Sequence, residues 1–435
     1  MNIKRVTVVG ANGTMGSNVA GIWASFGGAH VYMVSRTKEK SEEAINRAAK
    51  SVRADAIKQN MEAKDYSDLA ECISNSDLVF ESIAENEELK KNFLKEAAKH
   101  ISDHTLICSG TSGLSIDEMT EVLPPQYRGN FVGMHFFNPP YNMPLCELIG
   151  SEYVEKEKLE ELKRYLENIL LRTVVIVKDR PAFMGNRIGF FVINLAIQYA
   201  EIYKDKGGVD YIDAIMGPFT GRNMAPIRTA DFVGLDVHKA IVDNVYMNTN
   251  DYAKDAFKLP EYVEKLIGEG RLGYKTKEGL YKTIQTETGK KRYCVYDIKT
   301  NQYREIKNYD IPFASSMVKD FSEGLYGNAI ARLLDDYSEE GKICKKFMVE
   351  YVIYSLHINH EVGYTVYDAD DTMAAGFSWI PPLAVIESFG GKEEFTKVAR
   401  TVLTEKEWDE MDVDTLLTNS LQSKYDYKRF FKAKK

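Results

Sequence analysis

Near the start of the chain stands Ile3-Lys-Arg-Val-Thr-Val-Val-Gly10-Ala-Asn-Gly13-Thr-Met-Gly16, a β-branched run that leads into three glycines. Residues 3–9 are predicted to form a buried parallel strand, and Ser17–Phe26 has the pattern of a helix. A strand, a glycine turn and a helix start form the arrangement that binds a dinucleotide. The glycines let the backbone approach a pyrophosphate, and the helix N-terminus supplies amide donors. The alternative is a tight strand-to-helix turn without a ligand.

The residues after this first unit continue the same alternation. Residues 38–71 are charged and predicted to be helical, and a further helix is predicted over Glu155–Leu170. Short apolar runs predict the remaining strands: His30–Ser35, Leu78–Ile83, Leu106–Ser109, Phe131–His135, Cys146–Ile149 and Val174–Val177. Strands that alternate with helices predict an α/β fold, with an N-terminal doubly wound Rossmann domain over residues 1–180. The candidate cofactor-binding residues in its glycine loop are Gly10, Asn12, Gly13, Thr14, Met15 and Gly16.

The end of the second predicted strand bears on the choice of cofactor. An acidic residue about 20 positions after the glycines would accept a hydrogen bond from the ribose 2′-hydroxyl of NAD and repel the 2′-phosphate of NADP. This chain has Ser35 there, followed by Arg36. Serine and arginine can receive a phosphate, so the local sequence favours NADP. The alternative is that Arg36 is a solvated surface residue.

A histidine and a carboxylate stand at the ends of two neighbouring predicted strands. His135 follows an apolar run, and Glu147 lies between apolar neighbours in the short strand Cys146–Ile149. A carboxylate in a buried strand needs a partner, and a nearby histidine can be that partner. The pair predicts a general base that an acid holds in one tautomer. The alternative is a histidine satisfied in the core, with Glu147 at the rim.

The chain after residue 180 is predicted to be mostly helical. A first helical domain covers residues 181–282 and starts with the long apolar helix Asn186–Tyr203. Residues 283–311 contain two alternating runs, Arg292–Ile298 and Gln302–Ile306, which predict a β-hairpin linker. Residues 312–435 are predicted to be helical again, and the last 40 of them show no pattern that predicts a role.

An internal repeat relates the two helical segments. The run Val209–Phe219 resembles Tyr367–Phe377. At a fixed offset of 158 residues, Asn186 corresponds to Cys344. The first copy therefore has a polar side chain at its helix start that the second copy has lost. We expect the second copy to be degenerate, to pack or dimerise, and to do no chemistry.

Composition limits the partners and the compartment. The net charge of −8 argues against a nucleic-acid partner, because phosphate binding needs a positive field. The five cysteines are scattered without metal-ligand spacing, so we expect no metal site and predict free thiols in a reducing cytoplasm. No apolar segment is long enough to span a bilayer, and the N-terminus lacks the pattern of a signal peptide.

Together these motifs resemble the 3-hydroxyacyl-CoA dehydrogenase family. The stretch Gly133-Met-His-Phe-Phe-Asn-Pro139 resembles its most distinctive motif, and the spacing of twelve residues from His135 to Glu147 also matches. The family's order is followed by Gly10–Gly16, Glu85-Asn86…Lys90, Thr111-Ser112, Lys178-Asp179…Pro181…Asn186-Arg187 and Leu272-Gly273…Lys275…Gly279…Tyr281. The resemblance is firm over residues 1–282 and looser over about 283–395. There the chain looks like the large members with two helical repeats, and we expect it to lack their crotonase-type hydratase domain.

The resemblance implies an oxidoreductase of fatty-acid β-oxidation that interconverts (3S)-3-hydroxyacyl-CoA and 3-oxoacyl-CoA, with NAD or NADP as the cofactor. It implies that His135 is the general base and that Glu147 orients it. Ser112 and Asn186 would hydrogen-bond the reacting oxygen and the thioester region, and such donors favour charge that develops there. Glu85 and Lys90 would lie at the nicotinamide and substrate edge.

Departures from the family pattern keep alternatives open. The glycine loop is one residue longer, the acid at the end of the second strand is Ser35, and Gly110 and Gly113 replace an asparagine and a serine. The acyl-chain preference and the cofactor are therefore undecided. One alternative is a dehydrogenase of another hydroxy acid or of a cyclic hydroxyacyl-CoA, and another is a non-catalytic nucleotide-binding scaffold. A homodimer and a pseudo-dimeric monomer are the two expected assemblies.

Overall fold

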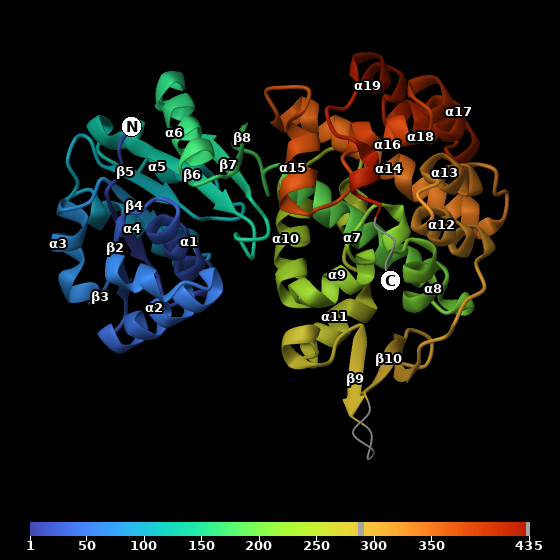
Figure 1. Ribbon diagram of the computed structural model, residues 1–435, viewed down its shortest axis with the longest axis horizontal. Helices are drawn as coiled ribbons and strands as arrows, with labels where there is room; N and C mark the ends of the chain where they lie inside the picture. Colours follow the sequence, from blue (N-terminus) through green and yellow to red (C-terminus); the bar gives the residue numbers. More distant parts are fainter. Residues whose placement is uncertain (286–290, 432–435) are drawn as a thin grey trace. The chain divides into compact units, whose positions relative to one another are not determined.

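The computed structural model describes residues 1–285 and 291–431 (Figure 1). The chain divides into two compact units. The first unit holds Met1–Phe183 together with Val362–Tyr364, and the second holds Met184–Glu361 together with the chain from Thr365 onward. Along the colour bar of Figure 1, Met1–Phe183 runs from blue to green, and the chain from Met184 onward runs from green to red.

The first unit is built on an eight-stranded sheet in the order β3-β2-β1-β4-β5-β6-β7-β8. All neighbouring strands are parallel except β6 and β7, which are antiparallel. Every residue of β4, β5 and β6 is buried, which requires cover on both faces of the sheet. The strands are β1 Arg5–Val9, β2 His30–Ser35, β3 Met61–Asp65, β4 Leu78–Glu81, β5 Leu106–Ser109, β6 Phe131–Phe136, β7 Leu145–Gly150 and β8 Thr173–Val177.

Helices between these strands complete the doubly wound arrangement, which confirms the predicted fold class. Their bounds are α1 Thr14–Ser25, α2 Lys38–Val52, α3 Leu69–Ser74, α4 Glu87–Ala97, α5 Ile116–Thr120 and α6 Lys156–Asn168. Helix α1 begins directly after the glycine loop and buries Trp23 in the core. The sheet therefore carries its first strand-to-helix turn at the carboxyl end of β1, where doubly wound folds bind ligands.

Strand β3 corrects the prediction that residues 38–71 are helical throughout. Met61–Asp65 lies at the edge of the sheet and pairs with β2 alone. Only Met61 is fully buried, so the sequence Met-Glu-Ala-Lys-Asp carries little of the apolar pattern that marks a strand. Pairing with β2 overrides the low β-propensity of these residues.

The second unit is mainly helical. Its helices are α7 Gly185–Ile202, α8 Val209–Ile215, α9 Pro226–Val233, α10 Leu235–Asn248, α11 Glu261–Gly268, α12 Pro312–Ser322, α13 Tyr326–Leu334, α14 Glu339–Val362, α15 Asp368–Gly376, α16 Pro382–Ser388, α17 Lys392–Val402, α18 Glu405–Glu410 and α19 Val413–Asn419. Helix α14 ends at Val362, the first residue of the short segment Val362–Tyr364 that belongs to the first unit. Across residues 1–285 and 291–431, no helix combines the length and the apolarity that crossing a membrane requires.

The predicted hairpin is part of a small antiparallel sheet in the order β11-β10-β9. Strands β10 (Lys291–Asp297) and β11 (Gln302–Glu305) form the hairpin itself, and β9 (Tyr281–Gln285) adds a strand before it. Residues 286–290 of the predicted linker, and residues 432–435 of the predicted second repeat, lie outside the described residues.

Two buried aspartates show how the helical segments resemble each other. Oδ1 of Asp213 accepts a hydrogen bond of 2.9 Å from the amide of Ile227, at the start of α9. Oδ1 of Asp370 accepts one of 2.9 Å from the amide of Leu383, at the start of α16. Both helices begin with a proline, which has no amide proton of its own, so the carboxylate satisfies the next amide along.

The counterpart of Asp213 is thus Asp370. The fixed offset of 158 residues would make it Asp371, which instead accepts a hydrogen bond of 2.6 Å from the Tyr425 hydroxyl. A single fixed offset therefore does not hold through the repeat, and the pairing of Asn186 with Cys344 at that offset loses its support.

The C-terminal residues pack against the second helical segment. The Ser423 hydroxyl donates a hydrogen bond of 2.7 Å to Oδ2 of Asp370. Further on, the ring of Phe431 stacks on Phe321 with centroids 4.7 Å apart. These contacts give the tail a packing role that the sequence alone does not reveal.

Candidate active site

The glycine loop between β1 and α1 has the shape of a phosphate-binding turn. Gly10 has a φ of 77°, and a Cβ there would lie 2.4 Å from the carbonyl oxygen of Ser82, the residue directly after β4. A Cβ on Gly16 would lie 2.5 Å from the Gly10 carbonyl oxygen. Within the described chain, α1 starts without a side-chain cap and without an acidic residue in its first turn, so its first amides suit an anion. These observations fit a dinucleotide. The remaining loop residues are partly or fully exposed: Asn12, Gly13, Thr14 and Met15.

The structure places Ser35 and Arg36 differently from each other. Ser35 is 0% exposed, and its hydroxyl has no hydrogen-bond partner among the described residues, so it does not face a phosphate at the surface. Arg36 is exposed. Across the β2–β3 pairing, Ser35 lies beside Asp65. Hydrogen bonds from the side chain and the backbone of Ser67 lower the pKa of Asp65, which keeps a negative charge at this edge of the sheet.

A buried ion pair lies where β4 ends. Lys90, from α4, and Glu81, the last residue of β4, are each 1% exposed. The Lys90 ammonium donates hydrogen bonds of 2.8 and 2.9 Å to the two carboxylate oxygens of Glu81, and the hydroxyl of Ser109 also donates to Glu81. Glu81 is not among the site residues that the sequence predicts. The signal that could have found it is a carboxylate next to an apolar strand run, which is related to the signal that identified Glu147.

Glu85 links the loops that follow β4 and β5. Its Oε1 accepts hydrogen bonds from the Thr111 hydroxyl at 2.6 Å and from the Ser112 amide at 2.8 Å. Its Oε2 lies 3.4 Å from the Lys90 ammonium. Both loops are at the carboxyl ends of parallel strands, where ligands bind in such sheets. Lys90 therefore supports Glu85 from within the protein, whereas the predicted position for Lys90 was the edge itself.

His135 and Glu147 face each other across the antiparallel pair β6–β7. His135 Nδ1 lies 2.7 Å from Glu147 Oε2, and both residues are buried, Glu147 completely. A carboxylate can only accept a hydrogen bond, so Nδ1 carries the proton and the lone pair of the neutral ring is on Nε2. The rings of Phe137 and Phe183 pack on the imidazole with centroids 4.6 and 5.8 Å away. The imidazole is therefore held in one orientation.

The first unit brings together two groups of predicted site residues, His135 with Glu147 and Glu85 with Lys90 and Ser112. Asn186 belongs to the second unit, where it is the second residue of α7 and is buried. Its part in the reaction stays a prediction.

The chain is similar to one family over most of its first two thirds. Residues 5–180 match the model described as the NAD binding domain of 3-hydroxyacyl-CoA dehydrogenase, and residues 183–283 match its C-terminal domain. The mitochondrial hydroxyacyl-coenzyme A dehydrogenase of Sus scrofa is 31% identical over 296 residues, which cover 64% of this chain and 91% of that protein. A probable 3-hydroxyacyl-CoA dehydrogenase of Bacillus subtilis is 28% identical over 424 residues, which cover 91% of this chain. The chain spans only 52% of that relative's length.

Solved structures show the same architecture. The (S)-3-hydroxybutyryl-CoA dehydrogenase of Ralstonia eutropha is 27% identical, with a TM-score of 0.56, over 64% of this chain and 98% of that one. The 3-hydroxybutyryl-CoA dehydrogenase of Escherichia coli is 19% identical, with a TM-score of 0.71, over 96% of this chain and 98% of that one. The second likeness extends the shared fold through both helical segments.

The buried pair of Glu81 and Lys90 yields a stability prediction. Glu81→Gln leaves the buried Lys90 ammonium with only the partly exposed Glu85 carboxylate, 3.4 Å away, as its counter-charge, so we expect the free energy of unfolding to fall by about 3 kcal/mol. The double variant Glu81→Leu/Lys90→Met removes both charges and should recover most of that loss. Chemical denaturation of the parent protein, of Glu81→Gln and of the double variant measures these differences in the free energy of unfolding. A Glu81→Gln variant as stable as the parent would contradict this role.

Proposed function

Because this chain belongs to the 3-hydroxyacyl-CoA dehydrogenase family, we propose that it interconverts (3S)-3-hydroxyacyl-CoA and 3-oxoacyl-CoA. The observation that carries the proposal is the buried His135–Glu147 pair, in a sheet whose first strand-to-helix turn suits a dinucleotide. A histidine fixed by a carboxylate is the group that removal of a hydroxyl proton requires.

The residues of the chain divide the work of the reaction. In the oxidative direction, Nε2 of His135 takes the proton of the 3-hydroxyl group while the C3–H bond breaks and the carbonyl forms. Bound nicotinamide supplies the acceptor for the hydride that leaves C3. Glu147 stabilises the imidazolium that results, since its carboxylate is 2.7 Å from Nδ1. In the reductive direction the same imidazolium returns the proton to the oxygen.

Polar groups around the base would hold the substrate. We propose that the Ser112 hydroxyl and the Asn186 amide donate hydrogen bonds to the reacting oxygen and the thioester region, which favours charge that develops on the oxygen. Support for the placement of Ser112 comes from its amide, which Glu85 fixes at 2.8 Å at the carboxyl end of the sheet. Glu85 in turn is held by Lys90 from within the protein.

The catalytic proposal predicts a graded loss of activity. Purified protein should oxidise NADH in the presence of acetoacetyl-CoA. His135→Gln should lower kcat by about 10³-fold, because the proton then has no base, and Glu147→Gln by about tenfold or more. Stopped-flow or steady-state absorbance at the NADH band measures both rates.

Two controls accompany that assay. Each variant should bind NADH as the parent does, and Cys344→Ala, a change at a buried thiol in the second helical segment, should keep the parent's turnover. If the parent oxidises neither NADH nor NADPH with acetoacetyl-CoA, the proposal fails. A non-catalytic nucleotide-binding scaffold, or a dehydrogenase of another hydroxy acid, would then remain.

We propose that the cofactor is NAD rather than NADP. The matched family domain is an NAD binding domain, and the Ser35 hydroxyl, which the sequence favours as a partner of a 2′-phosphate, is buried. The carboxylate of Asp65 stands on the neighbouring strand, beside Ser35, and would repel such a phosphate.

The cofactor proposal predicts a higher kcat/KM for NADH than for NADPH. Asp65→Asn should raise the relative use of NADPH several-fold and leave the use of NADH nearly unchanged. Asp55→Asn is the matched control, because Asp55 is an exposed carboxylate that precedes the opposite end of β3. Equal or better use of NADPH by the parent protein would reject the proposal.

We further propose that the chain works as a pseudo-dimeric monomer, with its second helical segment in the place of a partner subunit. Helix α7 of the first helical segment packs directly on helix α14 of the second. The ring of Phe191 on α7 stacks on Tyr354 of α14 with centroids 4.0 Å apart. Sedimentation should therefore give a mass near 49.4 kDa. A species of twice that mass at micromolar concentration would favour the homodimer.

A reducing compartment suits this chain, and we propose the cytoplasm. All five cysteines are buried free thiols. Cell fractionation that finds the protein in an exported fraction would contradict this.

A further inference from the structure

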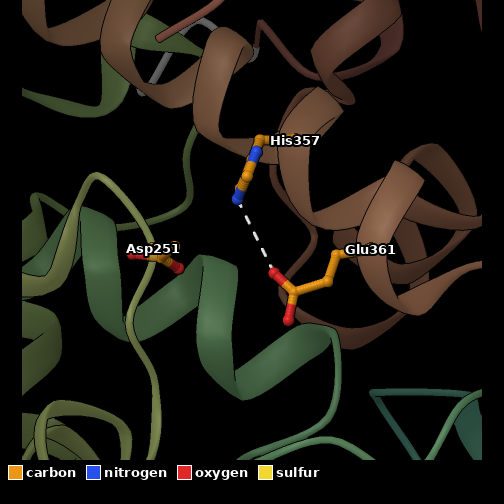
Figure 2. A group of neighbouring side chains, drawn as sticks. All are labelled: Asp251, His357 and Glu361. Atoms are coloured by element: carbon orange, nitrogen blue, oxygen red, sulfur yellow. Dashed lines mark ion pairs between the residues drawn. The ribbon is translucent and has the colours of Figure 1, made fainter. Parts of the chain in front are cut away.

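The second unit contains a cluster of charged side chains that the proposed chemistry does not use. Figure 2 shows Asp251, His357 and Glu361 pointing toward one another, with His357 and Glu361 on one helix, α14, and Asp251 on a separate segment after α10. One potential ligand atom from each side chain lies within 4.8 Å of the others. This spacing is compatible with a metal ion. A metal would bind here only if the two carboxylates had no other positive charge beside them.

Arg187 supplies the balancing charge. Its Nη1 and Nη2 donate hydrogen bonds of 2.8 and 2.9 Å to the two oxygens of Glu361, and Nη2 also donates one of 2.6 Å to Oδ2 of Asp251. The hydroxyl of Tyr354 donates to the same Asp251 oxygen at 3.1 Å, and the amide of Ala253 donates to Oδ1 at 3.0 Å. Every carboxylate oxygen is thus already engaged, and a divalent cation would meet a fixed positive charge. The cluster is an arginine site and does not suit a metal.

The guanidinium of Arg187 needs these partners because it is 1% exposed. Burial by itself lowers the pKa of Arg187, but Tyr354, Glu361 and Asp251 outweigh that effect and raise it. A buried charge held by a two-pronged contact has one orientation, because the planar fork matches the carboxylate. Loss of Glu361 would remove two of these hydrogen bonds and leave Asp251 as the remaining carboxylate partner of the guanidinium.

The contact between Arg187 and Glu361 bears on the start of α7, because Arg187 lies there. Arg187 directly follows Asn186 in the first turn of α7. Whatever fixes the guanidinium therefore also restrains the backbone that carries Asn186. Glu361 makes two of the three hydrogen bonds to carboxylates, and it comes from the second helical segment, 174 residues further along the chain.

We propose that Glu361 is a positioning residue, which holds Arg187 and thereby sets the place of Asn186 at the start of α7. The second helical segment then takes part in catalysis without touching the substrate. The inference rests on the proposed function, in which Asn186 contacts the substrate.

The test compares two glutamate variants of the same helix. Glu361→Gln removes the charge and one of the two acceptors that face Arg187. Glu350→Gln is the matched control, because Glu350 is a buried residue of α14 that accepts a hydrogen bond of 2.9 Å from Tyr199, near the far end of α7. Hydrogen exchange by mass spectrometry follows peptides that cover residues 184–191, and steady-state assays with acetoacetyl-CoA and NADH follow turnover.

We expect Glu361→Gln to speed exchange at the start of α7 and to lower kcat about tenfold, with the KM for NADH unchanged. Glu350→Gln should change neither quantity. Arg187→Lys keeps the positive charge but cannot make the two-pronged contact with a carboxylate, so it should behave as Glu361→Gln does. It replaces Glu361→Gln in the test if that variant fails to fold. The double variant Glu361→Gln/Arg187→Lys should lose no more activity than either single variant, since both substitutions break the same contact.

Several outcomes would overturn the inference. It fails if Glu361→Gln exchanges and turns over like the parent, if exchange rises without a fall in kcat, or if Glu350→Gln has the same effects. Stoichiometric binding of Zn²⁺ that Glu361→Gln abolishes would replace the arginine site with a metal site. If the parent protein does not reduce acetoacetyl-CoA, the proposed function fails on its own. The exchange experiment would then still decide whether Glu361 holds the segment around Asn186.

Discussion

A charged side chain that is buried requires a partner of opposite charge or a hydrogen-bonding group beside it, and this requirement recurs at each part of the candidate site. The buried Glu147 has His135 across β6–β7, the buried Glu81 has Lys90 from α4, and the buried guanidinium of Arg187 has Glu361. An unpaired buried charge costs several kcal/mol. Each pairing is therefore strongly favoured, and it fixes the position of the partner side chain as well. The positions of the base, of the Glu85 loop and of the start of α7 all follow from these pairings.

The sequence predicts those parts of the fold in which the type of each residue depends on its local surroundings, such as burial in a strand or the space around a turn. Apolar runs mark the buried parallel strands, and the glycine loop is predicted because Gly10 and Gly16 have no room for a Cβ. The edge strand β3 escapes prediction because it buries only one residue fully and depends on pairing with β2. Local patterns cannot show a strand whose stability comes from its neighbour.

The same limit explains which site residues could be found. His135 and Glu147 are recognised because both interrupt apolar strands twelve residues apart. Glu81 carries an equal signal, but its partner Lys90 is on a helix, and the sequence does not show that the two meet. The contact between Arg187 and Glu361 joins residues 174 positions apart, which no spacing rule predicts. The correspondence of Asp213 with Asp370 likewise needs the hydrogen bonds that each makes to the helix after it.

The proposed reaction depends most on His135 presenting Nε2 as a base while Glu147 holds Nδ1. Nitrogen-15 NMR of the labelled protein, with the His135 signal assigned by comparison with His135→Gln, measures this directly. At a pH where the ring is neutral, the account predicts a proton on Nδ1 and none on Nε2, and Glu147→Gln should disturb that preference. A neutral ring that carries its proton on Nε2 would contradict the account, because no lone pair would then be left there to accept the hydroxyl proton.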